Sequence, residues 1–154
     1  METTLVLVKP DGVQRRLVGR IVSRFEEKGL QLVGLRLVRL ERPLLEKHYG
    51  AHKAKPFYEG LVSYMASSPV VAVALRGKNA VAVVRKMMGA TFGSKAEPGT
   101  IRGDYAISDG FNLVHGSDST EAAAKELDLF FGGSVVEWTP GDHEWVYDVS
   151  DGAR

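Results

Sequence analysis

The run of residues from Thr3 to Val8 constrains this chain more than any other segment. Its sequence, TTLVLV, is too short for a helix and rich in the β-branched residues that favour strands. Leu and Val occupy successive positions, so the strand is apolar on both of its faces. We therefore expect it to lie in the middle of a sheet.

The residues that follow predict a turn, a helix and a second strand. Lys9-Pro10-Asp11-Gly12 is typical of a turn, because Pro presets φ and Gly supplies a positive φ. Apolar residues then recur at helical spacing over 17–25, and Gly29 is placed to cap this helix at its C-terminus. The apolar alternation over 30–37 slips by one position at Gly34, which predicts a strand with a β-bulge.

The rest of the chain continues to alternate between helices and strands. We expect short helices over 43–52 and 57–66, a buried strand over 70–75, a helix over 80–88, a short strand over 111–115, and a helix over 119–131 with Asp118 and Glu121 as its capping box. Residues 89–110 hold five glycines and a proline with little periodicity. They are expected to form a long loop, and a loop of that length is usually functional.

This order of elements predicts an α+β fold of the ferredoxin-like kind. The fold is a sandwich with a four-stranded antiparallel sheet (βαββαβ), helices on the faces and a long loop before the last strand. A length of 154 residues fits a single domain over 1–154. We expect residues 132–154 to be a docked C-terminal tail, because Trp138, Trp145 and Tyr147 would be costly to leave in water.

Composition narrows the class of protein. The chain has 44% apolar and 25% charged residues, which is typical of a soluble globular protein and excludes disordered and collagen-like chains. It has no cysteine, which excludes a disulfide framework, a thiolate metal site and a cysteine nucleophile. The first residues lack the basic segment of a signal peptide, and no stretch approaches the roughly 18 apolar residues of a membrane span. We therefore expect a cytoplasmic protein with no membrane partner.

Charge is distributed unevenly along the chain, although the net value is only +1. Residues 1–55 carry a net charge of +6, residues 56–103 of +4 and residues 104–154 of −9. This asymmetry indicates either a surface for polyanions or an acidic segment packed against a basic body. We favour the second interpretation, because the basic residues never form a run of five or six.

The common nucleotide-binding and hydrolase motifs are missing from the sequence. It has no G-x-x-x-x-G-K-[ST], no G-x-G-x-x-G after a strand, no G-x-S-x-G and no H-E-x-x-H. His48 and His52 lie four residues apart and could share a metal ion, but the sequence offers no third ligand. We expect both to be solvent-facing helix residues.

His115 stands in a more suggestive position, at the end of a short strand and just before a helix N-terminus, where free N–H groups favour anions. Histidine is largely neutral near pH 7 and can attack phosphorus as a nucleophile, although an isolated histidine is also often structural. Glu126 lies on the expected inward face of the next helix. It would either fix the tautomer of His115 or pair with a surface cation such as Lys125.

Three cations stand close to the ends of the expected elements and could hold phosphate groups. They are Lys9, Arg85 and Arg102. Arginine brings a planar fork that suits phosphate oxygens, whereas lysine brings a point charge. Taken alone, each is more typical of a solvated surface residue.

Four segments of the chain carry a recognisable pattern. They are KPDGV (9–13), SPVVA (68–72), PGTIRGD (98–104) and NLVHGSD (112–118). In their order and spacing they resemble the nucleoside diphosphate kinase family, and the similarity runs from about Leu5 to Tyr147. The segment N-x-x-H-G-S-D is a highly specific signature of that family.

The resemblance implies a kinase without a P-loop. It would move the γ-phosphoryl group of a nucleoside triphosphate, typically ATP, to a nucleoside diphosphate through a phosphohistidine, with broad base specificity. His115 would be the phosphorylated nucleophile, assisted by Glu126 and Ser117. The nucleotide would be bound by Lys9, Tyr49, Arg85, Thr91 and Arg102 at its phosphates, by Lys9 and Asn112 at the ribose 3′ hydroxyl, and by Phe57 and Leu61 at its base.

The resemblance also implies a cofactor and an assembly. Mg²⁺ would be held mainly by the phosphates of the nucleotide, with no metal site of its own on the protein. The chain would form a homo-oligomer, with a hexamer favoured and a tetramer as the other possibility.

Three positions depart from the family's pattern. Phe92-Gly93 follows Thr91, where Asn or Asp and often Pro are usual, and Phe111 stands in place of Arg or His. Asp109 falls where an apolar residue usually covers the base. None of these is the nucleophile, so we expect them to affect loop packing, subunit contacts and base affinity.

The alternative function is a non-catalytic ferredoxin-like module that binds nucleotide or single-stranded nucleic acid. Such a module would have no use for His115 and Glu126 on adjacent elements. Exposed aromatic residues interleaved with basic ones are also missing from the expected strands. We therefore favour the phosphotransferase and expect no nucleic-acid partner.

Overall fold

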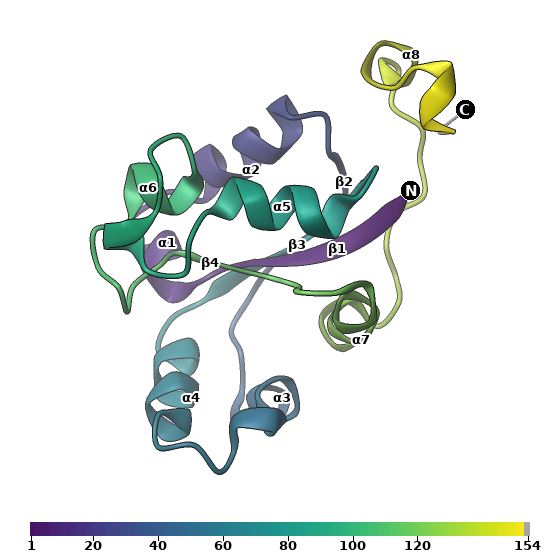
Figure 1. Cartoon of the computed structure of the whole chain (residues 1–154). Helices are drawn as coiled ribbons and strands as arrows, with labels where there is room; N and C mark the ends of the chain where they lie inside the picture. Colours follow the sequence, from purple (N-terminus) through teal and green to yellow (C-terminus); the bar gives the residue numbers. More distant parts are fainter. Residues whose placement is uncertain (153–154) are drawn as a thin grey trace.

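The strand β1 (Glu2–Val8) lies at the centre of the fold, as its sequence predicts. In the computed structural model, which describes residues 1–152, it belongs to a four-stranded sheet with β2 (Gln31–Val38), β3 (Val70–Gly77) and β4 (Val114–Gly116). The strand order is β2-β3-β1-β4, and all neighbouring strands are antiparallel (Figure 1). The predicted ferredoxin-like α+β sandwich is confirmed.

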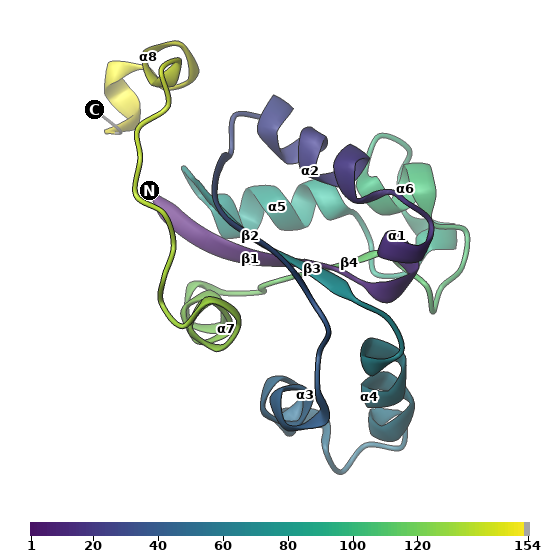
Figure 2. The same cartoon turned by 180° about the vertical axis from the view of Figure 1, so that it is seen from behind.

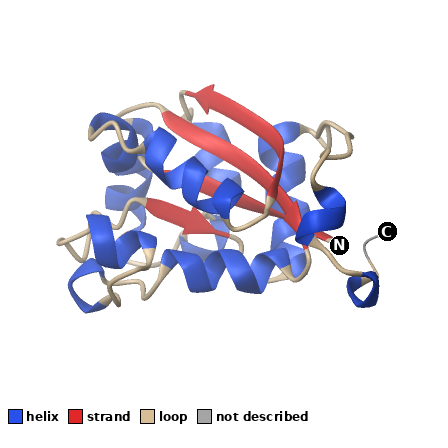
Figure 3. Cartoon of the chain, turned by 90° about the horizontal axis from the view of Figure 1, so that it is seen from above, coloured by secondary structure: helices blue, strands red, loops and turns tan. Residues whose placement is uncertain are grey.

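Helices cover both faces of this sheet (Figures 1 and 2). One face carries α2 (Val18–Glu27), α5 (Ala80–Met88) and α6 (Ile101–Tyr105), and the other carries α3 (Arg42–His48), α4 (Tyr58–Ala66) and α7 (Thr120–Phe131). Viewed from above, the strands cross the middle of the molecule with helices around them (Figure 3). Shorter elements are α1 (Pro10–Gln14), α8 (His143–Val146) and the 3₁₀ turns Gly50–His52, Gly93–Lys95 and Val149–Asp151.

Alternate side chains of β1 enter two separate cores. Val6 and Val8 pack with α2 and α5, whereas Leu5 and Leu7 pack with α3, α4 and α7. All four side chains are fully buried. Each core therefore depends on the same strand, which explains why its sequence is apolar at successive positions.

The KPDG segment forms the helix α1, so the predicted turn is wrong. Pro10 occupies the first helical turn, where a missing N–H is tolerated, and the N–H of Val13 donates to the carbonyl of Lys9 at 3.1 Å. Gly12 has no positive φ. A Cβ at Gly12 would lie 2.6 Å from the side chain of Val8, so this glycine is required for close packing.

The bulge expected in β2 is confirmed. The pairing of β2 with β3 shifts its register between Leu32 and Gly34, which leaves Val33 as the extra residue. A Cβ at Gly34 would lie 2.8 Å from the ring of Phe131, so the glycine lets α7 approach the sheet closely.

Two expectations for the second half of the chain need correction. The long loop over 89–110 contains the helix α6, which begins where the Thr100 hydroxyl accepts a hydrogen bond from the N–H of Gly103. The helix α7 is capped by Ser119, whose hydroxyl accepts from the N–H of Ala122 at 3.0 Å, and not by Asp118. In both cases the hydroxyl three residues before the N–H decides where the helix begins.

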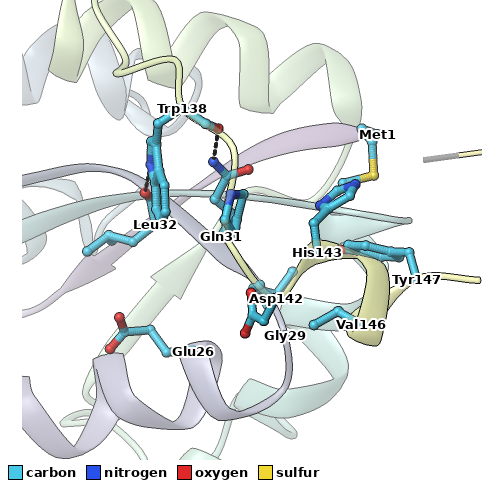
Figure 4. Close-up of a pocket in the computed structure, with 12 residues that line it drawn as sticks. Met1, Glu26, Gly29, Gln31, Leu32, Trp138, Asp142, His143, Val146 and Tyr147 are labelled. Carbon is cyan, nitrogen blue, oxygen red and sulfur yellow. Dashed lines mark hydrogen bonds between the residues drawn. The ribbon is translucent and has the colours of Figure 1, made fainter. Parts of the chain in front are cut away.

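The C-terminal segment passes beside β2, where the N–H of Val136 donates to the carbonyl of Val33 at 2.7 Å and Trp138 lies next to Gln31 and Leu32 (Figure 4). Trp138 Nε1 donates to the carbonyl of Leu32 at 2.9 Å, and Gln31 Nε2 donates to the carbonyl of Trp138 at 2.5 Å. A cavity of about 160 Å³ remains between this segment and the end of α2. Trp145 is 85% exposed and Trp138 is 49% exposed, so the expectation that these rings avoid water is wrong. In the single turn of α8, Val146 faces Gly29 and its neighbour Trp145 faces outward.

Candidate active site

His115 lies in the short edge strand β4, where it is paired with Leu7 of β1. Its Nε2 lies 2.9 Å and 3.2 Å from the two carboxylate oxygens of Glu126 on α7. Ser117, fully buried, donates its hydroxyl to Glu126 Oε1 at 2.7 Å. Three side chains predicted as catalytic are therefore joined in one hydrogen-bonded group.

The charge of Glu126 sets the tautomer of His115. Burial alone would raise the pKa of Glu126, but the hydrogen bonds from His115 and Ser117 and the nearby His48 outweigh it and lower the pKa below its usual range. An ionised carboxylate only accepts hydrogen bonds, so the proton of His115 sits on Nε2. The lone pair of the neutral ring is then on Nδ1, the nitrogen that Glu126 does not contact.

His48 is buried beside this group, so the expectation of a solvent-facing residue is wrong. Its side chain is 4% exposed, and its Nδ1 lies 3.7 Å from Glu126 Oε2. Its ring is 5.1 Å from the ring of His115 in an edge-to-face arrangement. Burial and the neighbouring His115 lower the pKa of His48 to about 4. The sequence could not reveal this neighbour, because α3 and β4 meet only in the folded chain.

A cavity of about 520 Å³ opens over the side chains of His115 and Glu126. Tyr49 and His52 line one side of it, and Asp118 at the start of α7 lines the other. Burial, together with the charge of Glu126, raises the pKa of the Tyr49 phenol well above its usual value. The cavity is large enough to admit a small ligand to His115.

A second group of predicted residues is linked through Asn112. Lys9 Nζ donates to Asn112 Oδ1 at 2.8 Å, and Asn112 Nδ2 donates to the carbonyl of Thr91 at 2.8 Å. Arg102 Nε donates to the carbonyl of Asn112 at 3.1 Å. These four residues come from four separate segments, and the structure brings them together beside β4.

The cations of this group are less solvated than the sequence indicated. Arg102 is 6% exposed and also donates to the carbonyls of Gly89 at 3.1 Å and Val114 at 2.6 Å. Burial lowers the pKa of Arg102 to about 10, and burial together with the charge of Arg102 lowers the pKa of Lys9 to about 8. Of the three cations, only Arg85 is exposed, and its guanidinium donates to the carbonyl of Gly116 at 3.1 Å.

The two residues expected at the base lie at the start of α4 and line neither group. Phe57, just before α4, is 53% exposed and packs beside His52 with a ring separation of 5.5 Å. Leu61 is half-buried one turn later. Neither residue lines the cavity over His115.

The unusual residues of this chain have partners of their own. Asp109 accepts a hydrogen bond from the Ser94 hydroxyl at 2.5 Å, which holds the loop after Phe92. The ring of Phe111 lies 5.5 Å from that of Tyr64. Neither contact involves His115.

The comparisons with known proteins agree with this geometry. A family model described as nucleoside diphosphate kinase matches residues 2–136. A nucleoside diphosphate kinase of Pelotomaculum thermopropionicum is 54% identical over 149 residues, which is 96% of this chain and 100% of the relative. Nucleoside diphosphate kinase 1 of Spinacia oleracea is 53% identical over 96% of this chain and 100% of its own length.

Solved structures give the same result. A halophilic nucleoside diphosphate kinase from Halobacterium salinarum in complex with CDP has a TM-score of 0.92 and 48% identity, over 96% of this chain and 99% of that chain. A nucleoside diphosphate kinase from Encephalitozoon cuniculi has a TM-score of 0.91 and 45% identity, over 96% of this chain and 100% of that chain. With a family model over most of its length and relatives above 50% identity, this chain belongs to the nucleoside diphosphate kinase family.

Proposed function

We propose that this member of the family transfers the γ-phosphoryl group of a nucleoside triphosphate, typically ATP, to a nucleoside diphosphate through a phosphohistidine at His115. Nucleoside diphosphate kinase activity is what close, full-length relatives imply. The contact of Nε2 with Glu126 is the observation that supports His115 as the nucleophile. It leaves Nδ1 as the nitrogen with a free electron pair toward substrate.

The transfer takes place in two matching halves. Nδ1 of His115 attacks the γ-phosphorus, an N–P bond forms, and the bond to the β–γ bridging oxygen breaks as nucleoside diphosphate leaves. The proton stays on Nε2, and the negative Glu126 stabilises the positive charge that develops on the ring. A second diphosphate then attacks the phosphohistidine by the reverse path. Ser117 holds Glu126 in place for both halves.

The remaining residues would position the nucleotide. We assign Lys9, Tyr49, Arg85, Thr91 and Arg102 to the phosphates, Lys9 and Asn112 to the ribose 3′ hydroxyl, and Phe57 and Leu61 to the base. The guanidinium of Arg102 has five N–H groups, and three are used on backbone carbonyls, so the others remain for a phosphate. Because stacking reads no base edges, specificity for the base should be broad.

Mg²⁺ would arrive as part of the substrate. The group around Asn112 contributes the cations Lys9 and Arg102, which suit phosphate oxygens and not a metal ion. The ion would therefore be held mainly by the nucleotide phosphates, where it neutralises their charge.

A binding module without turnover is the competing function. Sheet-based modules that bind single-stranded nucleic acid stack bases on an open sheet face. Here helices cover both faces of the sheet (Figures 1 and 2). The side chains of β1 are buried on each face. This arrangement favours the phosphotransferase.

Labelling the protein itself tests the proposed function. Incubation with Mg²⁺ and ATP labelled at the γ-phosphate should yield an acid-labile, base-stable label that ADP or GDP removes. His115→Ala should take up no label, whereas His143→Ala, a control on α8, should be labelled fully. A label that survives in His115→Ala would overturn the assignment.

We further propose a homohexamer, with a tetramer as the alternative. Apolar side chains remain exposed on the edge strand β2 at Leu35 and Leu37 and in the loop at Ile107, which supports contact with other copies. Sedimentation of the whole chain and of a chain ending at Gly133 would show the oligomer and the part that the C-terminal segment plays. Within residues 1–152 no helix is long and apolar enough to cross a membrane. A cytoplasmic location remains our proposal.

A further inference from the structure

His48 is a buried side chain to which the proposed mechanism gives no role. Its Nε2 has no hydrogen-bond partner among residues 1–152, and its Nδ1 is 3.7 Å from Glu126, beyond hydrogen-bonding distance. Buried polar atoms usually have a partner, so an imidazole in this state requires an explanation. At neutral pH the ring is uncharged, because burial keeps its pKa near 4.

The nitrogen of His48 that faces Glu126 is Nδ1, and it belongs to a group of three possible ligand atoms. His48 and His115 each offer a ring nitrogen and Glu126 a carboxylate oxygen, all within 4.8 Å of one another. Zn²⁺ binds such atoms at about 2.0–2.2 Å, which places the ligands of a tetrahedral site roughly 3.3–3.5 Å apart. The separations from Glu126 Oε2 are 2.9 Å to His115 Nε2 and 3.7 Å to His48 Nδ1, on either side of that value. The two imidazole nitrogens lie within 4.8 Å of each other, so the side chains would have to rotate to close the site around an ion.

We propose that His48, His115 and Glu126 form a transition-metal site that binds Zn²⁺, and that the bound ion prevents His115 from accepting a phosphoryl group. Metal binding is independent of the proposed function, whereas inhibition rests on it. The site would regulate transfer from behind the nucleophile, on the side of the ring opposite the attacking Nδ1.

The chemistry of the three ligands favours zinc over magnesium. Two neutral imidazoles and one carboxylate suit Zn²⁺, while Mg²⁺ prefers oxygen ligands in an octahedral arrangement. Ser117 donates to Glu126 Oε1 and thereby orients the carboxylate, as a metal ligand requires. The cavity over His115 can admit a water molecule as the fourth ligand.

Zinc would inhibit by reversing the tautomer of His115. In the free protein the proton is on Nε2 and the electron pair is on Nδ1. Zinc coordination needs the electron pair of Nε2, so the proton moves to Nδ1 and the ring stays neutral. Nδ1 then has no electron pair with which to attack phosphorus. A ligand bound to Nε2 thus blocks attack by Nδ1 from the other side of the ring.

Direct metal binding tests the first half of the proposal. Zn²⁺ binding to the purified full chain is measured by equilibrium dialysis in the presence of Mg²⁺, and Co²⁺ is used as a spectroscopic substitute that absorbs strongly when tetrahedral. We expect one ion per chain, and His48→Ala should weaken binding by about tenfold or more. His48→Leu fills the same space without a ligand atom and should behave alike, which separates loss of a ligand from loss of packing.

His52→Ala is the matched control, because this histidine lines the same cavity and lies one turn from His48. It should retain the zinc affinity of the unaltered chain within about twofold. Loss of binding in His52→Ala would place the ion between His48 and His52 and overturn the proposal. Binding that survives both changes at His48 would overturn it as well.

Phosphohistidine formation tests the second half. With Mg²⁺ and labelled ATP, Zn²⁺ should reduce labelling of the unaltered chain, and His48→Leu should need at least about tenfold more Zn²⁺ for the same fractional loss. Each variant is compared with its own rate without zinc. Labelling without zinc binding would refute the metal site alone, whereas zinc binding without any labelling would refute the proposed function alone.

Discussion

The carboxylate of Asp11 accepts a hydrogen bond from the backbone N–H of Leu113 at 3.0 Å. Leu113 has a φ of 71°, a left-handed conformation that is costly for a residue with a branched side chain. It lies two residues before His115, and the N–H of Lys9 also donates to its carbonyl, at 2.8 Å. The segment of Asp11 therefore holds the backbone that leads into the nucleophile's strand.

Removing that carboxylate should reduce both stability and turnover. Asp11→Ala leaves both the buried N–H of Leu113 and the hydroxyl of Tyr64 without their acceptor. We expect the free energy of unfolding to fall by about 1–3 kcal/mol, and kcat to fall because His115 is less well placed. Urea unfolding and steady-state kinetics measure the two effects. Asp128→Ala, an exposed change on α7, should alter neither, and a stable, active Asp11→Ala would contradict the prediction.

Glu126→Ala should give a folded protein with a much lower kcat. Without the carboxylate, His115 loses the group that keeps its proton on Nε2 and stabilises its positive charge. Loss of an equivalent orienting carboxylate in other enzymes costs several orders of magnitude, so we expect about a hundredfold or more here. Far-UV circular dichroism checks folding, and steady-state rates check kcat. Unchanged kcat would mean that Glu126 is only a structural residue.

Activity should decline in alkaline solution because of Lys9. Its pKa is lowered to about 8, so the ammonium is charged below that pH and neutral above it. A neutral amine attracts neither phosphate nor the ribose hydroxyl as strongly, so kcat/KM, which reports the free enzyme, should fall as pH rises through about 8. Lys9→Arg stays charged and should lose this alkaline limb whatever its absolute rate. If Lys9→Arg shows the same decline of kcat/KM above about pH 8, the decline belongs to another titrating group.

Phe57→Ala should weaken the binding of all nucleotides to a similar extent. Stacking on an aromatic ring contributes about 1–3 kcal/mol per base and depends little on which base is stacked. We expect kcat/KM to fall by a similar factor for all four bases, and the spread among them to stay below about tenfold in the unaltered chain. Trp145→Ala, exposed on α8, is the control. A wide spread among the bases would indicate hydrogen-bond readout.

Gly29→Ala should loosen the C-terminal segment. Gly29 has a φ of 96°, and a Cβ there would lie 2.8 Å from the side chain of Val146. The left-handed conformation alone costs about 1–2 kcal/mol for a residue with a Cβ, and the contact with Val146 adds to it. Gly19→Ala is a matched control in α2, where a Cβ meets open space and should stabilise by about 0.5–1 kcal/mol. Thermal unfolding should give a lower melting temperature for Gly29→Ala than for Gly19→Ala. Equal melting temperatures for the two variants would contradict this prediction.

Periodicity alone predicted much of this fold. The helix over 80–88 has the predicted bounds, and the bulge in β2 follows from the slip at Gly34. Periodicity missed the places where a single polar contact fixes the start of a helix. The hydroxyl of Thr100, for example, caps α6 inside the expected loop. Short helices have too few apolar residues to form a pattern.

The sequence could identify residues of the candidate site, but it could not identify the side chains that pack against them. The family signature contains His115, the wider resemblance implied a role for Glu126, and the structure joins the two side chains. No local pattern could place His48 against them, because that contact depends on the packing of α3 on the sheet. The burial of Arg102 was equally hidden, since its partners are backbone carbonyls that no sequence motif reveals.

Only three residue pairs join β4 to β1, and one of them is Leu7 with His115. The proposed nucleophile is thus positioned by the same strand whose side chains fill both cores. A substitution in either core that shifts β1 would shift His115 with it, and a misplacement of about 1 Å is enough to slow chemistry. The rate of the enzyme should therefore report on the packing of its interior, alongside the melting temperature.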